Sequence, residues 1–150
     1  MSTPITIADI VLVDIDASTK EEATRKLAER LVAAGRVTEI NGYLEAVAKR
    51  EEHFPTGIAG GIAIPHAQSD LVVTPSVAVA TSKTGIDFGA DDGPSTLIFL
   101  IAAPASGDST HLEILGSLAR KVMHEDFCDS LRAETDPAAI ADIVTREVQK

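Results

Sequence analysis

The feature that most constrains the fold is an unbroken apolar run from Leu97 to Ala105. This run falls far short of the roughly 20 residues that a membrane-spanning helix needs. A strand over Leu97–Ala102 would be apolar on both of its faces, whereas a half-exposed strand alternates apolar and polar residues. The run therefore predicts a central strand in a sheet that is covered on both faces.

Two amphipathic helices are predicted before this strand. Ser18 to Glu21 is a capping-box pattern, in which Ser18 bonds an unpaired N–H group of the first turn and Glu21 reaches back. Apolar residues follow at helical spacing, and Gly35 stands where a left-handed residue commonly ends a helix. A second helix is predicted from near Asn41 to Glu52.

Three more helices are predicted after the apolar strand. Thr110 to Glu113 is another capping box, and the leucines that follow it are spaced for a helix. A short helix is predicted over Glu125–Arg132. Asp136 and Pro137 then open a last helix, because aspartate is favoured as N-cap and proline at the first helical position.

Shorter apolar segments complete the predicted sheet. Ile62–Ile64 predicts a very short buried strand that stops at Pro65, because proline has no N–H group to donate to a ladder. Val77–Thr81 predicts another strand, and Ile10–Val13 is either a strand or a packed entry segment. We therefore expect one α/β domain over residues 1–150, with three layers: a central mixed sheet of about five strands, flanked by helices on both faces.

The charge balance disfavours several classes of partner. With 23 acidic and 13 basic side chains the formal net charge is −10, which argues against nucleic acid and anionic membrane surfaces. Cys128 is the one cysteine, so neither an internal disulfide nor a cysteine zinc site is predicted. The first residues lack the basic region of a signal peptide. We expect a cytoplasmic protein with no direct insertion into a membrane.

Several familiar chemistries are not supported by motifs. The sequence has no Walker phosphate loop, no HExxH and no GxSxG elbow. Cys128 has acidic neighbours, which oppose the thiolate that a nucleophilic cysteine requires. A metal site could recruit His66, Asp70 and His111, but no second pair of ligand-spaced residues supports it. No metal and no cofactor is predicted.

The histidines remain as candidate reactive groups. His66 directly follows Pro65, so its ring is expected at a strand end, and strand ends are where open α/β sheets bind ligands. The alternative, an exposed loop histidine, stays open on this local pattern. His53 is interpreted as a surface residue, and His124, between two predicted helices, is given no role.

Two further residues could support chemistry at His66. His111 is predicted at the first turn of a helix, whose N-terminus attracts anions. Arg50 precedes the connection to His66, and a guanidinium offers a planar set of donors that matches phosphate oxygens. Taken singly, each is more simply explained as a surface residue: His111 as one that tolerates a first turn, Arg50 as a partner of the helix dipole.

Several motifs in order resemble a known family. They are Arg50-Glu51-Glu52, Pro55-Thr56-Gly57-Ile58, Gly61-Ile62-Ala63-Ile64-Pro65-His66, Asp87 through Pro94, Leu97 through Pro104, and His111-Leu112 with Leu115. Together they resemble the enzyme IIA proteins of the bacterial sugar phosphotransferase system, in the fructose/mannitol class that also includes the nitrogen-regulatory IIA proteins. The resemblance covers nearly the whole chain, and the fructose branch looks most similar.

The resemblance implies a phosphohistidine relay. In this family a phosphoryl group passes from the carrier protein HPr to a histidine of enzyme IIA, and then to a cysteine of the IIB domain of a sugar permease. His66 matches the phospho-accepting histidine, His111 the second active-site histidine, and Arg50 the arginine before the PTG loop. No metal or nucleotide is implied, because the donor already carries an activated phosphoryl group.

The residue chemistry fits this implication. Phosphoryl transfer spreads charge in its transition state, so positioned donors such as Arg50 and His111 would stabilise it. An imidazole with an ordinary pKa near 6.5 is both nucleophilic and able to leave near neutral pH. The sequence departs from the family at Ala67-Gln68, where a glycine and often a basic residue follow the acceptor histidine. That change removes one possible contact with phosphate or partner.

Two alternatives remain beside the sugar relay. A nitrogen-regulatory IIA protein would also be phosphorylated on His66, but would act by binding target proteins according to its phosphorylation state. An unrelated α/β domain with incidental histidines is the other. Onward transfer to a IIB cysteine separates the first of these from a sugar relay.

Overall fold

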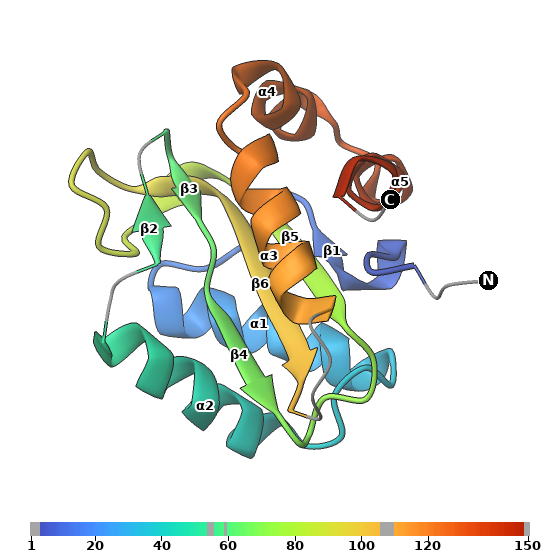
Figure 1. Cartoon of the computed structure of the whole chain (residues 1–150). Helices are drawn as coiled ribbons and strands as arrows, with labels where there is room; N and C mark the ends of the chain where they lie inside the picture. The colour runs from blue at the N-terminus through green and yellow to red at the C-terminus, as the bar shows by residue number, and fades with distance from the viewer. Residues whose placement is uncertain (1–3, 54–55, 59, 106–109, 149–150) are drawn as a thin grey trace.

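A central mixed sheet lies between two layers of helices (Figure 1). The computed structural model describes residues 4–53, 56–58, 60–105 and 110–148, and only the backbone of 110–112 and 115. Its elements are η1 (Ala8–Ile10), β1 (Val11–Leu12), α1 (Lys20–Ala33), α2 (Ile40–His53), β2 (Gly57–Ile58), β3 (Ile62–Ala63), β4 (His66–Ser69), β5 (Ser76–Ile86), β6 (Ser95–Pro104), α3 (Thr110–Lys121), α4 (Glu125–Ala133) and α5 (Pro137–Val148).

The sheet is built around a long antiparallel pair, β5 and β6. Its strand order is β1-β5-β6-β3-β2, and β4 also pairs with β6. β3 and β4 both run parallel to β6, with Ile62 opposite Leu97 and His66 opposite Ile101. The described sheet thus has six strands where about five were expected, since the short strands β2 and β4 carry little apolar pattern.

The prediction that the apolar run is a central strand is confirmed. Successive residues of β6 alternate between two cores, as the period of two in a strand requires. Ile98 and Leu100 pack with α1 and α2, whereas Phe99 and Ile101 pack with α3, α4 and α5. The three-layer α/β architecture follows, with α1 and α2 on one face and α3 to α5 on the other (Figure 1).

The start of α1 differs by one residue from the prediction. Thr19, not Ser18, is the N-cap, and its hydroxyl accepts a hydrogen bond from the backbone N–H of Glu22. Glu22, not Glu21, reaches back to the backbone N–H of Ser18 at 2.7 Å. The cause is in the sequence, because Thr19 to Glu22 fits the same capping pattern as Ser18 to Glu21.

The helix ends are otherwise well predicted. Gly35 has φ of 76°, and the N–H groups of Gly35 and Arg36 bond the carbonyls of Val32 and Leu31, which is a Schellman ending. Asp136 caps α5 through the N–H of Ala138 at 3.1 Å. The cap predicted for α3 involves side chains outside the described residues. Of the described helices, none combines the length and apolar character that crossing a membrane requires.

β3 ends before Pro65, as predicted, but a further strand that was not predicted, β4, begins at His66. Pro65 interrupts the ladder because it lacks an N–H group, but its carbonyl still accepts a hydrogen bond from Ile101. The chain then pairs with β6 again from His66 onward. His66 is therefore the first residue of a strand and not the residue after one.

Candidate functional site

His66 is half-buried, and both nitrogens of its ring have hydrogen-bond partners. Its Nδ1 lies 2.8 Å from the carbonyl oxygen of Ile64. Its Nε2 lies 3.2 Å from Nε of Arg50, which donates. Two different segments of the chain therefore orient the ring.

These two contacts select one tautomer of the neutral ring. Arginine can only donate, so the Nε2 atom that faces Arg50 must carry a lone pair. The backbone carbonyl of Ile64 can only accept, so Nδ1 must carry the proton. The ring nitrogen of His66 that carries a lone pair in this arrangement is therefore Nε2.

Arg50 reaches His66 from the last turn of α2. This helix packs on one face of the sheet through Tyr43 and Val47. β4 is an edge strand among those described, with β6 as its partner, so an arginine at the helix end can reach the ring. The structure thus brings together two of the three residues that the sequence indicated.

The third residue, His111, lies in the first turn of α3. Its side chain is outside the described residues, so only its place in the backbone is known. His66 stands opposite Ile101, which packs in the same core as Ile114 and Leu118 of α3. Because register neighbours share a face of a sheet, α3 covers the face on which His66 lies. A role for His111 beside His66 stays a prediction.

Sequence reasoning missed a carboxylate next to Arg50. Glu51 accepts hydrogen bonds from both the backbone N–H and the hydroxyl of Thr56. Thr56 is buried, and its carbonyl in turn accepts from the backbone N–H of Ile64. Glu51 and Thr56 are part of the motifs that carry the resemblance, but neither spacing nor composition indicated that they contact each other.

The contact of Tyr43 with the strand beside His66 was also not predicted from the sequence. The side chain of Tyr43 is fully buried, and its hydroxyl donates to the carbonyl of Ile101, the register partner of His66. Burial raises the pKa of this phenol well above its ordinary value, so Tyr43 is a neutral donor. Gln68, at the position where the family often has a basic residue, is exposed and donates to the carbonyl of Pro104.

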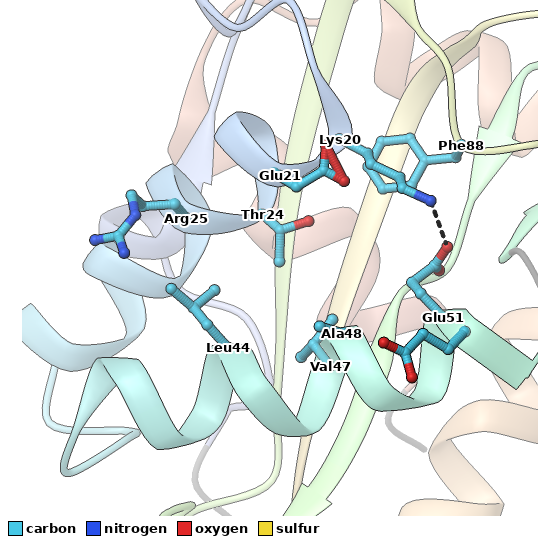
Figure 2. A pocket seen from close by; sticks show the side chains of 10 residues that line it. Lys20, Glu21, Thr24, Arg25, Leu44, Val47, Ala48, Glu51 and Phe88 are labelled. Atoms are coloured by element: carbon cyan, nitrogen blue, oxygen red, sulfur yellow. Dashed lines mark ion pairs between the residues drawn. The ribbon is translucent and has the colours of Figure 1, made fainter.

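A pocket of about 410 Å³ lies between α1 and α2. Figure 2 shows Phe88 beside the ion pair of Lys20 and Glu51, and Leu44 farther along α2, near Arg25. Neither His66 nor Arg50 lines it. The phosphoryl transfer expected at His66 would therefore lie outside this pocket, although Glu51 of α2 lines the pocket and also binds Thr56.

The alternatives to phosphohistidine chemistry gain no support. Within the described residues no three His, Cys, Asp or Glu side chains gather as metal ligands; the side chain of His111 is not among them. Cys128 is buried, as predicted. Burial, with Asp129 adding to it and Arg132 opposing it, raises the pKa of the Cys128 thiol, which disfavours the thiolate.

Comparison with known proteins decides the family. The family model described as "Phosphoenolpyruvate-dependent sugar phosphotransferase system, EIIA 2" matches residues 5–147. The chain belongs to this family. It is therefore a phosphotransferase component of a sugar phosphotransferase system, in agreement with the resemblance seen in the sequence.

Curated relatives in this EIIA family include free-standing and fused proteins. The fructose-specific EIIA component of Haloferax volcanii is 40% identical over 97% of this chain and 95% of its own length. The fructose-specific EIIABC component of Bacillus subtilis is 36% identical over 91% of this chain, which matches only 22% of that protein.

Solved structures of EIIA proteins share the fold. The nitrogen-regulatory IIA protein of Neisseria meningitidis aligns with a TM-score of 0.84 and 25% identity, covering 94% of this chain and 97% of that one. The mannitol IIA protein of Escherichia coli, in its complex with phosphorylated IIB, aligns with a TM-score of 0.76 and 27% identity, covering 91% and 94%. The predicted fold class is confirmed.

Proposed function

We propose that His66 accepts a phosphoryl group on Nε2 from phosphorylated HPr and passes it to a cysteine of a IIB domain during fructose uptake, in the cytoplasm. The observation that carries this proposal is the pair of contacts to the ring, Arg50 to Nε2 and Ile64 to Nδ1. They leave a lone pair on Nε2, hold the proton on Nδ1, and place a guanidinium where the phosphoryl oxygens would lie.

The proposed transfer needs no external base. The lone pair of Nε2 attacks phosphorus while the bond from phosphorus to the donor's histidine nitrogen breaks, and that nitrogen takes the electron pair. The proton stays on Nδ1 of His66, which remains hydrogen-bonded to the carbonyl of Ile64. In the second step a IIB thiolate attacks the same phosphorus, and Nε2 recovers its lone pair.

Arg50 is the proposed electrostatic partner of the transferred group. Its Nε lies 3.2 Å from the accepting nitrogen, so a phosphoryl group on Nε2 would replace this contact with charge-assisted bonds to its oxygens. His111 is the proposed second donor, at the N-terminal turn of α3. Both would act on the charge that spreads over the equatorial oxygens in the transition state.

Fructose is the proposed sugar because the relative that matches over almost its whole length is named fructose-specific. A IIB partner is supported by the mannitol IIA structure, which contains a phosphorylated IIB. The nitrogen-regulatory alternative has a structural neighbour at 25% identity, which is a weaker likeness in sequence. HPr as donor follows from the resemblance.

The proposal is tested by labelling with phosphoenolpyruvate, enzyme I and HPr, followed by mapping of the acid-labile phosphate. We expect His66→Ala to abolish labelling, because it removes the nitrogen that is proposed to carry the phosphoryl group. His53→Ala is the matched control, since His53 is an exposed histidine at the end of α2. For His111→Ala we expect acceptance to survive in part while transfer to IIB slows.

The outcomes separate the competing functions. Labelling that persists in His66→Ala and is lost in another histidine variant would contradict the site. Labelling on His66 without onward transfer to any sugar-specific IIB would instead favour the nitrogen-regulatory function.

A further inference from the structure

Glu51 is hydrogen-bonded to Thr56, which in turn bonds the residue that contacts the His66 ring. The side chain of Glu51 is only 10% exposed. One of its oxygens, Oε1, accepts hydrogen bonds from both the backbone N–H of Thr56, at 3.1 Å, and the Thr56 hydroxyl. These contacts join the last turn of α2, which also carries Arg50, to Thr56, the buried residue that directly precedes β2.

The contact continues from Thr56 to His66 through backbone hydrogen bonds. The carbonyl of Thr56 accepts from the N–H of Ile64 at 3.1 Å. The carbonyl of the same Ile64 accepts the Nδ1 proton of His66 at 2.8 Å. Glu51 is therefore linked to Ile64, whose carbonyl selects the tautomer of the ring, through its contact with Thr56 and one backbone hydrogen bond.

We propose that Glu51 is a positioning residue for phosphoryl transfer at His66, because it fixes the place of the Ile64 carbonyl relative to Arg50. This inference rests on the proposed function of His66. Glu51 orients both halves of the site at once: its own helix carries the guanidinium, and its carboxylate holds Thr56, which bonds the residue that supplies the carbonyl.

A carboxylate suits this place because two donors converge on it. Thr56 is 4% exposed, so its N–H and hydroxyl would lose water and gain nothing if Glu51 were absent. The other oxygen of Glu51, Oε2, lies 3.7 Å from Nζ of Lys20 at the edge of the pocket (Figure 2). Lys20 thus forms an ion pair through the oxygen that does not bind Thr56.

The test compares three variants by two measurements, the tautomer of the His66 ring and the rate of phosphoryl acceptance. In Glu51→Ala, nitrogen NMR of His66 should show a loss of the Nδ1–H tautomer, and phosphoryl acceptance should slow by about 10²-fold, as expected for a misplaced reactive group. In Glu51→Gln, an amide oxygen still accepts from Thr56, so we expect a slowing below about tenfold. Lys20→Met keeps the Thr56 contacts and should leave the tautomer unchanged.

A purely structural role for Glu51 would give a different pattern. The melting temperature would fall in Glu51→Ala while the tautomer and the rate stayed at wild-type values, and this result would overturn the proposal. If Glu51→Ala does not fold, Thr56→Val decides instead. It removes one of the two donors and should shift the tautomer by a smaller amount, whereas a wild-type tautomer in Thr56→Val would overturn the proposal.

This experiment distinguishes a failure of the Glu51 proposal from a failure of the proposed function of His66. The tautomer of His66 is measured on the unphosphorylated protein, so it reports on Glu51 whether or not His66 accepts phosphate. Wild-type protein that is not labelled on His66 would contradict the proposed function alone.

Discussion

The ring of His66 is held at both nitrogens, and the two contacts have different origins. The contact at Nδ1 is local, since Ile64 lies two residues away. The contact at Nε2 comes from Arg50, sixteen residues earlier on a helix. A ring oriented in this way loses little rotational freedom when it reacts, which is the entropic advantage of a preorganised site.

Removal of the Arg50 guanidinium should slow transfer while leaving the acceptor in place. We expect Arg50→Ala to reduce the rate of phosphoryl acceptance by about 10²–10³-fold, comparable to the loss of one preorganised donor in other enzymes. Rapid-quench labelling by phosphorylated HPr measures this rate. Lys49→Ala removes an exposed neighbouring cation and is the matched control; equal rates in both variants would show that Arg50 acts only through charge.

The residues that bear the site were predictable to different degrees. His66, Arg50 and His111 were predicted from the sequence and its motifs, and the structure places the first two in hydrogen-bond contact. The tautomer could not be predicted, because it depends on which atoms the fold places at each nitrogen. Glu51 could not be predicted either, since surface carboxylates at the end of a helix are common and only the folded loop supplies its two donors.

At the scale of elements, the hairpin formed by β2 and β3 supports the site. β2 pairs antiparallel with β3, with Gly57 opposite Ala63. The backbone N–H of Gly57 also bonds the carbonyl of Phe88, so the hairpin packs closely against the turn between β5 and β6. This close approach leaves no room for a side chain at residue 57.

Gly57→Ala should destabilise the protein by about 1–3 kcal/mol, as overpacking in a dense interior does. A Cβ atom there would lie 2.8 Å from both the Ala90 nitrogen and the Phe88 oxygen, and these are backbone atoms. Urea unfolding gives the free energy of unfolding. The control is Gly116→Ala, where a Cβ in α3 would meet only the Arg120 side chain at 3.6 Å.

The control should change stability in the opposite direction. Alanine is favoured over glycine inside a helix by roughly 0.5–1 kcal/mol, so Gly116→Ala is expected to stabilise the protein. A Gly57→Ala variant as stable as wild type would mean that the hairpin can move away from the turn.

Element boundaries were predicted well where a local signal exists. Gly35 and Asp136 end and begin helices where the sequence indicated. The end of β3 before Pro65 was predicted, but β4 was not, because the neighbouring strand β6 is long enough to pair on both sides of the proline. Such long-range pairing has no local signature.

At the scale of the molecule, charge is the dominant property. A formal net charge of −10 repels phosphorylated small molecules, and it attracts a partner that is basic around its phosphohistidine. Arg50 opposes this field locally, because its guanidinium lies beside Nε2 of His66. Overall charge was available from the sequence, but the placement of this cation was not.

The rate of acceptance should therefore depend on salt. We expect kcat/KM for phosphorylated HPr to fall several-fold as ionic strength rises from about 0.01 to 0.15 M, because the Debye length shortens from roughly 30 to 8 Å. Steady-state labelling over a salt series measures it. The melting temperature over the same series is the control, and a constant kcat/KM would show that charge does not steer this encounter.

The position of β4 at the edge of the described sheet has a consequence for how partner proteins bind at His66. The half-buried ring of His66 begins this strand, and Nε2 is the ring nitrogen whose lone pair the proposed transfer uses. If His66 accepts and donates a phosphoryl group as proposed, donor and recipient must both approach this one atom. The two proteins would then bind one after the other, and the protein would not hold both at once.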